Sequence, residues 1–360
     1  MRIYLDHNAT SPLRPEVKQA MRDAMDVFGN ASSVHSEGRK AHKLMDDARE
    51  ALAFNLGCLP QMITFTGGGT EANNMALRGV DVDRILISAI EHPSVSAAAK
   101  AGGKPVEVIP VDSFGRVDLS ALEHMLNGPK ALVSVMVANN ETGVVQPIDD
   151  IVALATKVGA LTHVDAVQAF GKRQVNFGLM GVDMMTIGAH KVGGPTGIGA
   201  LIIRDGLVVE PFMQGGGQEL RRRAGTENLI AIAGFAATAK TVRLDTNELN
   251  DALETALEDA VIFSDGVERL CNTTCFAMSD MKAETALMNF DLEGIAVSSG
   301  SACSSGKVAR SHVLEAMGVA PEISSTAIRV SLGWNTTAED IQHFIAVWRK
   351  LNQRSKAKAA

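Results

Sequence analysis

Short apolar runs alternate with amphipathic stretches between residues 60 and 205. Unbroken apolar runs of this length are typical of strands that are covered on both faces. We expect strands at 84–90, 106–110, 131–137, 161–165, 184–187 and 199–203. We expect helices at 71–78, 94–101, 119–126 and 151–158. The alternation predicts an α/β fold in which a mostly parallel sheet lies between layers of helices.

The pattern changes after about residue 245. Residues 247–262 predict a charged amphipathic helix, shorter elements follow, and 337–351 predict a C-terminal helix. Thr336 and Thr337 precede Glu339 and Asp340, which indicates an N-cap and an acidic first turn. We therefore expect a second, smaller α+β domain over about 250–360.

Composition narrows the class of protein. The 360 residues suggest about two domains, and a net charge of −7 argues against a general nucleic-acid binder. Four cysteines do not make a disulfide framework and fit a reducing compartment. The N-terminus shows no apolar secretion signal, and the longest apolar run, 229–239, predicts a buried helix rather than a membrane span. We expect a cytoplasmic protein without nucleic-acid or membrane partners.

The segment FTGGGTEANN, residues 65–74, is the strongest single feature. An apolar run leads into three glycines and then into a helix that Thr70 and Glu71 open. Backbone N–H groups and the helix dipole can hold a phosphate at such a turn. The alternative is a tight strand-to-helix turn that requires a positive φ. The motifs GxGxxG and GxxxxGK[ST] do not match here.

Two other apolar runs end in side chains that suit a ligand site. Asp165 ends one run, with Gln168 on the next turn, and a carboxylate there could hold a cationic ring nitrogen. A helix cap is the alternative for His163 and Asp165, and a metal site at these two residues lacks further ligands nearby. Lys191 follows another run and precedes a glycine-rich segment. A desolvated lysine there can form a Schiff base, whereas the alternative is a surface lysine.

Cysteine and arginine residues give further candidates. Cys303 lies among small polar residues in VSSGSACSSG, 297–306, which predicts an exposed loop and a candidate nucleophile, or else an incidental surface thiol. Cys271 and Cys275 offer half a metal site at best and are interpreted as core or edge residues. The segment GGGQELRRRAGTEN, 215–228, suits an anion site at a subunit interface. Arg329 lies mid-strand, so it should meet a carboxylate of a substrate or of an internal salt bridge.

Together these segments resemble the cysteine desulfurases, pyridoxal-phosphate enzymes of the class V aminotransferase superfamily with fold type I. The resemblance covers nearly the whole chain and includes YLDHNATSPL, GNASSVHSEGR, EHPSV, ANNETGVVQPI and SHVLEAMG. The loop around Cys303 resembles group I of that family. The resemblance implies a large cofactor-binding domain, 15–250, and a small domain, 1–14 and 251–360, that carries a mobile cysteine loop.

The resemblance also implies roles at the ring of pyridoxal 5'-phosphate. Lys191 would form the Schiff base, and Asp165 would pair with the ring nitrogen. Gln168 would hydrogen-bond the phenolic oxygen, and His92 would stack on the ring and move protons. Cys303 would be the catalytic nucleophile, and its persulfide could transiently ligate the metal of an iron–sulfur cluster.

Other residues would hold the phosphate and the substrate. Thr226 would reach the phosphate of the neighbouring subunit's cofactor, which implies a homodimer. Asn140 would contact the cofactor and, with Arg329, the substrate carboxylate. The remaining phosphate ligands would be Gly69, Thr70 and His190.

The implied activity converts L-cysteine to L-alanine. Lys191 would remove the Cα proton, and the Cys303 thiolate would attack the substrate sulfur. The persulfide would pass to an acceptor protein, such as an iron–sulfur scaffold in a nitrogen-fixation setting, or to a tRNA-thiolation partner. A selenocysteine lyase and a small-amino-acid aminotransferase are alternatives on the same fold. A non-catalytic sulfur carrier would lack Lys191 or Cys303, and both are present.

Three positions depart from the family pattern. Gly188 stands where a serine usually contacts the phosphate, so that contact is lost or replaced. Thr196 stands where a lysine is common, and Trp334 stands where an arginine is frequent. None of these changes removes a residue of the core chemistry.

Overall fold

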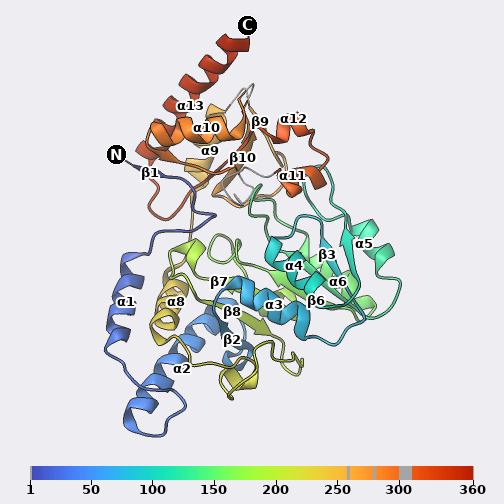
Figure 1. Ribbon diagram of the computed structural model, residues 1–360, viewed down its shortest axis with the longest axis vertical. Helices are drawn as coiled ribbons and strands as arrows, with labels where there is room; N and C mark the ends of the chain where they lie inside the picture. Colours follow the sequence, from blue (N-terminus) through green and yellow to red (C-terminus); the bar gives the residue numbers. More distant parts are fainter. Residues whose placement is uncertain (1, 258–259, 279–280, 300–309, 360) are drawn as a thin grey trace.

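The computed structural model describes residues 2–257, 260–278, 281–299 and 310–359 (Figure 1). Within these ranges, seven strands form the central sheet in the order β2-β8-β7-β6-β5-β3-β4. Strand β8 runs antiparallel to both of its neighbours, and all other neighbouring strands are parallel. The strands are β2 (Ile63–Thr66), β3 (Arg84–Ser88), β4 (Val106–Ile109), β5 (Ala131–Met136), β6 (Leu161–Asp165), β7 (Met184–Gly188) and β8 (Gly199–Ile203). The expected α/β fold with a mostly parallel sheet is confirmed.

Helices cover this sheet. Helices α1 and α2 both pack on α8, and α3 packs on α4, as Figure 1 also shows. The helices are α1 (Pro15–Met25), α2 (Ser36–Leu56), α3 (Gly69–Gly79), α4 (Pro93–Ala101), α5 (Leu119–Met125), α6 (Ile148–Lys157), α7 (Phe177–Met180) and α8 (Leu229–Thr241). The apolar run at 229–239 is the buried helix that the sequence predicts. No helix in the described part of the chain is long and apolar enough to span a membrane.

A second group of elements lies above the sheet in Figure 1. It contains a two-stranded parallel pair, β1 with β11, and the antiparallel order β12-β10-β9. Its strands are β1 (Ile3–Tyr4), β9 (Val261–Ile262), β10 (Thr273–Ala277), β11 (Ile295–Ala296) and β12 (Ala327–Ser331). Its helices are α9 (Asn247–Ala256), α10 (Ala283–Leu292), α11 (His312–Ala316), α12 (Pro321–Ser324) and α13 (Ala338–Ala359).

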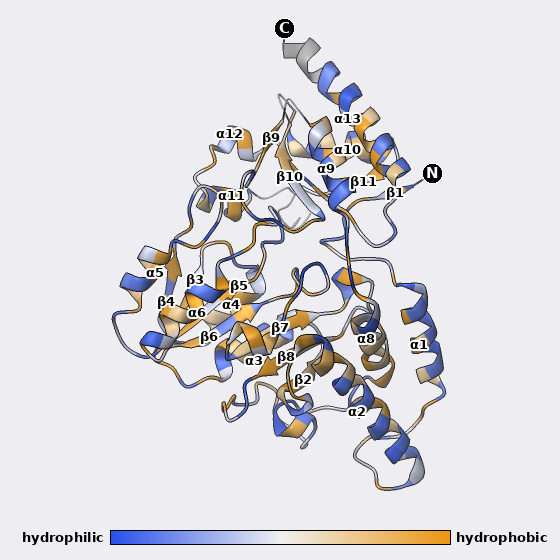
Figure 2. Cartoon of the chain, turned by 180° about the vertical axis from the view of Figure 1, so that it is seen from behind, coloured by the Kyte–Doolittle hydropathy of each residue, from blue (hydrophilic) through white to orange (hydrophobic). Residues whose placement is uncertain are grey.

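The first strand packs with the C-terminal part of the chain. Ile3 and Leu5 belong to one apolar cluster with buried residues between 253 and 351. A separate, larger apolar cluster surrounds the central sheet. In Figure 2 the strands of the central sheet are largely hydrophobic, whereas α1 and α2 on the outside are largely hydrophilic. The N-terminal segment therefore connects the two groups of elements.

Two expected helix boundaries differ from the structure. The helix expected at 247–262 ends at Ala256, because Val261 and Ile262 form β9 and pair with Ala277 and Phe276 of β10. The C-terminal helix continues past residue 351 to Ala359. Its expected cap is present, since the Asp340 backbone N–H donates to Thr337 Oγ1 at 3.2 Å.

A left-handed turn follows the central sheet at Glu219–Arg221. The φ angles of Glu219, Leu220 and Arg221 are 47°, 57° and 66°, a conformation that residues with a side chain rarely adopt. The Glu219 carboxylate accepts two bonds of 3.0 Å from the Arg49 guanidinium and one of 2.8 Å from the Phe65 backbone N–H. The Glu219 side chain is 1% exposed. This ion pair holds the turn against the sheet.

Replacing Arg49 by Met leaves the Glu219 carboxylate buried without its cationic partner. We expect Arg49→Met to lower the free energy of unfolding by about 3–5 kcal/mol, measured by urea denaturation. The control is Lys43→Met, which removes an exposed pair with Asp47 and should cost less than about 1 kcal/mol. Equal losses in the two variants would show that the buried pair does not hold the turn.

Candidate active site

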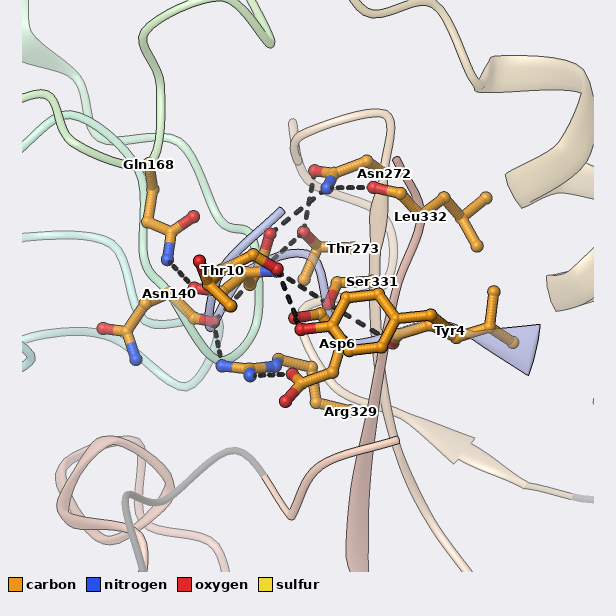
Figure 3. Close-up of polar contacts among 12 residues, drawn as sticks. Tyr4, Asp6, Thr10, Asn140, Gln168, Asn272, Thr273, Arg329, Ser331 and Leu332 are labelled. Carbon is orange, nitrogen blue, oxygen red and sulfur yellow. Dashed lines mark hydrogen bonds and ion pairs between the residues drawn. The ribbon is translucent and has the colours of Figure 1, made fainter. Parts of the chain in front are cut away.

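A pocket of about 680 Å³ lies where the carboxyl ends of the central strands face the N-terminal segment and β12. It brings together side chains from segments that are far apart in the chain, some of which Figure 3 shows. Its walls contain nine of the residues singled out from the sequence. They are Gly69, Thr70, His92, Asn140, Asp165, Gln168, His190, Lys191 and Arg329.

The glycine turn at 67–69 leads from β2 into helix α3 at the wall of the pocket. Gly68 has a φ of +148°, which favours glycine. A Cβ at Gly69 would lie 2.8 Å from Val167 Cγ2, closer than real side chains approach. The turn therefore requires glycine for steric reasons, and it also places Thr70 and the N-terminus of α3 at the pocket. The tight strand-to-helix turn is therefore confirmed, and the phosphate cradle stays a prediction.

Asp165 ends β6 and is 6% exposed. Its carboxylate accepts 2.9 Å hydrogen bonds from Asn73 Nδ2 and from the Val167 backbone N–H. Asn73 was not among the predicted site residues, although its place one helical turn after Gly69 and Thr70 could have indicated it. These two donors fix the orientation of the carboxylate in the pocket wall.

His163 does not belong to the pocket. Its ring nitrogens bond Ser134 Oγ at 2.8 Å and Thr186 Oγ1 at 3.0 Å, and burial lowers the pKa of His163 to about 4. The described residues contain no group of His, Cys, Asp or Glu side chains that could hold a metal ion. His163 is therefore a hydrogen-bonded core residue.

Lys191 follows β7 and lines the pocket, so it is not the surface lysine of the alternative interpretation. Loss of hydration lowers the pKa of Lys191 to about 8, while the Asp165 charge opposes this shift. Burial, together with the Lys191 charge, lowers the pKa of His190 to about 4 and also lowers the pKa of His92. His92 caps helix α4, because its Nδ1 accepts from the Ser94 backbone N–H. Near neutral pH, uncharged imidazoles thus surround a lysine that readily loses its proton.

Arg329 forms an internal salt bridge, which is one of the two interactions expected from the sequence. Its guanidinium lies 2.6 Å from Asp6 Oδ1 and donates a 2.8 Å hydrogen bond to the Asn140 backbone carbonyl (Figure 3). Its buried Nε has no hydrogen-bond partner in the described structure. Arg329 and Asp6 both line the pocket. A substrate carboxylate would therefore meet an arginine that is already held in place.

Other expected site residues lie elsewhere. Thr226 is exposed and does not line the pocket, and Cys303 lies outside the described residues. Cys275 is buried in β10, where burial raises the pKa of its thiol, and Cys271 is partly buried. The interpretation of Cys271 and Cys275 as core or edge residues therefore agrees with their positions.

Comparison with known proteins shows the family of this chain. Residues 3–344 match the family "Aminotransferase class-V". The chain is 38% identical to cysteine desulfurase IscS of Dictyoglomus turgidum over 373 residues, which cover 98% of this chain and 95% of the relative. The solved NifS-like protein from Rickettsia africae is 38% identical, with a TM-score of 0.91 and coverage of 98% and 100%. A structure of SspA in complex with cysteine is 29% identical, with a TM-score of 0.83 and coverage of 92% and 99%.

The chain therefore belongs to the aminotransferase class-V family. Within that family it is a member of the cysteine desulfurases of the IscS and NifS-like kind. The expected family, fold type and pyridoxal-phosphate dependence are confirmed.

The pocket residues fit pyridoxal 5'-phosphate chemically. The cofactor requires an anion cradle, a carboxylate for its ring nitrogen and a lysine amine. The N-terminus of α3, the oriented Asp165 carboxylate and Lys191 offer these three groups in one pocket. The neutral His190 and His92 also line it.

Gly188 offers room for the serine that the family usually carries there. A Cβ at this position would lie 3.5 Å from Val167 Cγ1, an ordinary contact, and the Gly188 φ is not positive. We expect Gly188→Ser to tighten cofactor binding roughly 2- to 10-fold, because it adds one hydrogen bond to the phosphate. Gly188→Ala is the matched control without the hydroxyl. Equal dissociation constants for the two variants, measured by fluorescence titration, would contradict this account.

The lowered pKa of Lys191 predicts how cofactor capture depends on pH. Only the neutral amine is nucleophilic, so the rate at which apoprotein captures pyridoxal phosphate should rise with pH and reach half its maximum near pH 8. Asp165→Asn should move this midpoint to lower pH, because the Asp165 charge raises the pKa of Lys191. Stopped-flow absorbance measures the rate. A midpoint near 10.5, the ordinary lysine value, would overturn the prediction.

Proposed function

We propose that this protein removes the sulfur of L-cysteine, releases L-alanine and retains the sulfur as a persulfide on Cys303. One observation carries the proposal. Ser298 and Arg310, which flank the segment that contains Cys303, line the same pocket as Lys191 and Asp165. A nucleophile from that segment and a lysine with a lowered pKa can thus serve one substrate.

The class of the enzyme follows from its family. The chain is a pyridoxal-phosphate-dependent cysteine desulfurase, as its class V match and its relatives show. The solved structure of SspA in complex with cysteine supports this amino acid as the substrate.

On the cofactor side, each residue has a specific role. Bound pyridoxal phosphate supplies an electron sink for the carbon that loses a proton. Asp165 would keep the ring nitrogen protonated, and Gln168 would donate to the phenolic oxygen. His92 would lie against the ring and move protons. The phosphate ligands in this proposal are Gly69, Thr70, His190 and Thr226 of a second subunit.

On the substrate side, Arg329 and Asn140 would bind the carboxylate. Because Asp6 already neutralises part of the Arg329 charge, the substrate carboxylate would have to share the guanidinium. The neutral Lys191 amine would take the Cα proton. The Cys303 thiolate would then form a bond to the substrate sulfur while the carbon–sulfur bond breaks. The electron pair of the broken bond stays on the substrate carbon, Cβ and Cα each take up a proton, and the carbon skeleton leaves as alanine.

The proposal includes a homodimer and a protein that accepts the sulfur. The exposed position of Thr226 supports its reach toward a second subunit. An iron–sulfur scaffold protein is the proposed acceptor, with the persulfide as a transient ligand, and the cytoplasm is the proposed compartment. The division into residues 15–250 and residues 1–14 with 251–360 is also proposed, and the two separate apolar clusters support it.

The activity test compares Cys303→Ala with the unchanged protein in a single turnover with L-cysteine. We expect the variant to bind the cofactor normally and to lose at least about 100-fold in alanine formation, because no thiolate is left to take the sulfur. Alanine is measured by mass spectrometry and sulfide by a colorimetric assay.

Cys58→Ala is the control, because burial raises the pKa of the Cys58 thiol to about 11 and keeps it unreactive at neutral pH. Alanine release by Cys303→Ala at the unchanged rate would favour a lyase or an aminotransferase instead.

A further inference from the structure

A lysine lies behind the wall of the active-site pocket. Lys172 is 5% exposed, and its Nζ lies 2.6 Å from Asn8 Oδ1 and 2.7 Å from Gln168 Oε1. No ion pair within the described ranges involves this ammonium, and its side chain does not line the pocket. Its two amide partners do line it. Lys172 therefore contacts the site only through other residues.

The hydrogen bonds leave only one orientation for the Gln168 amide. An ammonium group can only donate, so the oxygen Oε1 must face Lys172. A backbone carbonyl can only accept, so the nitrogen Nε2 must face Asn8 O, at 3.0 Å. This leaves the second N–H of Nε2 available to a ligand in the pocket.

Asn8 is fixed in the same way. Its Oδ1 accepts from Lys172 and from Asn272 Nδ2, at 3.2 Å. Its Nδ2 donates to the Asn140 carbonyl at 3.3 Å and to Thr273 Oγ1 at 2.8 Å. Lys172 thus orients one amide on the cofactor side of the pocket and one on the substrate side.

This arrangement is costly for stability alone. A buried ammonium with amide partners and no carboxylate is poorly compensated for its lost hydration. The neighbouring charges of Lys191 and Arg329 increase the penalty, and with burial they lower the pKa of Lys172 well below its usual value. An apolar side chain of similar length would fill the space without this penalty. The hydrogen-bonding pattern is what the lysine adds.

We propose that Lys172 is a positioning residue, whose buried ammonium turns the N–H side of the Gln168 amide toward the phenolic oxygen of the bound cofactor. This inference rests on the proposed contact between Gln168 and that oxygen. An oriented donor stabilises the anionic form of the oxygen. Its loss should therefore raise the pH midpoint at which the visible absorption band of the holoenzyme titrates.

The experiment is a double-mutant cycle on the holoenzyme with this midpoint as the readout. Lys172→Met and Gln168→Leu should each raise the midpoint by about one pH unit, and the combined variant should raise it no further. All other titratable or charged residues that line the pocket remain unchanged in all four proteins. They are Asp6, His92, Glu141, Asp165, His190, Lys191, Arg310, His312 and Arg329. Lys104→Met, which removes a partly buried lysine bonded to Val80 O, is the control and should leave the midpoint unchanged.

Three results would overturn the proposal. The first is that Lys172→Met leaves the pH midpoint unchanged, and the second is that Gln168→Leu leaves it unchanged. The third is that Lys172→Met shifts the midpoint equally in the presence and absence of Gln168. The last result would mean that the lysine acts by its charge alone. If Lys172→Met does not fold, Lys172→Gln takes its place, and the same three criteria apply.

The cycle does not depend on turnover of cysteine. A holoenzyme that shows the band but forms no alanine from cysteine would contradict the proposed function and leave this inference standing. Conversely, normal alanine formation together with additive shifts of the pH midpoint in the double-mutant cycle would contradict only the role of Lys172.

Discussion

The site depends on the burial of three basic side chains at the edge of the central sheet, namely Lys172, Lys191 and Arg329. Burial lowers the pKa of both lysines. The Arg329 charge lowers both pKa values further, and the Lys191 charge further lowers that of Lys172. Asp6 pairs directly with Arg329, and the Asp165 charge raises the pKa of Lys191. Charges in such surroundings persist only where partners fix them. The same balance leaves Lys191 able to lose its proton near neutral pH, which is what a lysine that serves as a base requires.

The N-terminal segment connects this charge balance to the fold. Ser11 N donates to the His190 carbonyl at 2.7 Å, and Arg14 N donates to the Gly193 carbonyl at 3.0 Å, so the segment follows the turn that carries Lys191. Trp334 Nε1 donates to the Pro12 carbonyl at 2.9 Å, and the Arg14 guanidinium lies 5.6 Å from the centre of its ring. The tryptophan that replaces the frequent arginine therefore also holds this segment.

Much of the fold could be predicted from the sequence because its strands are buried on both faces and appear as continuous apolar runs. Asp165 and Lys191 were found because parallel strands bring their carboxyl ends to one edge. The end of α9 was missed, since the short strand β9 is defined by its pairing with β10 and not by local periodicity. The partners Asn8 and Lys172 were missed as well. They are 164 residues apart, and no spacing rule connects them.

The central claim is that Lys191 forms the Schiff base with pyridoxal phosphate. Lys172 is the alternative lysine, because its amide partners line the same pocket. The holoenzyme is treated with borohydride, digested and analysed by mass spectrometry for the lysine that carries the pyridoxyl group. This account predicts the label on Lys191 and none on Lys172. A label on Lys172 or on another lysine would contradict it.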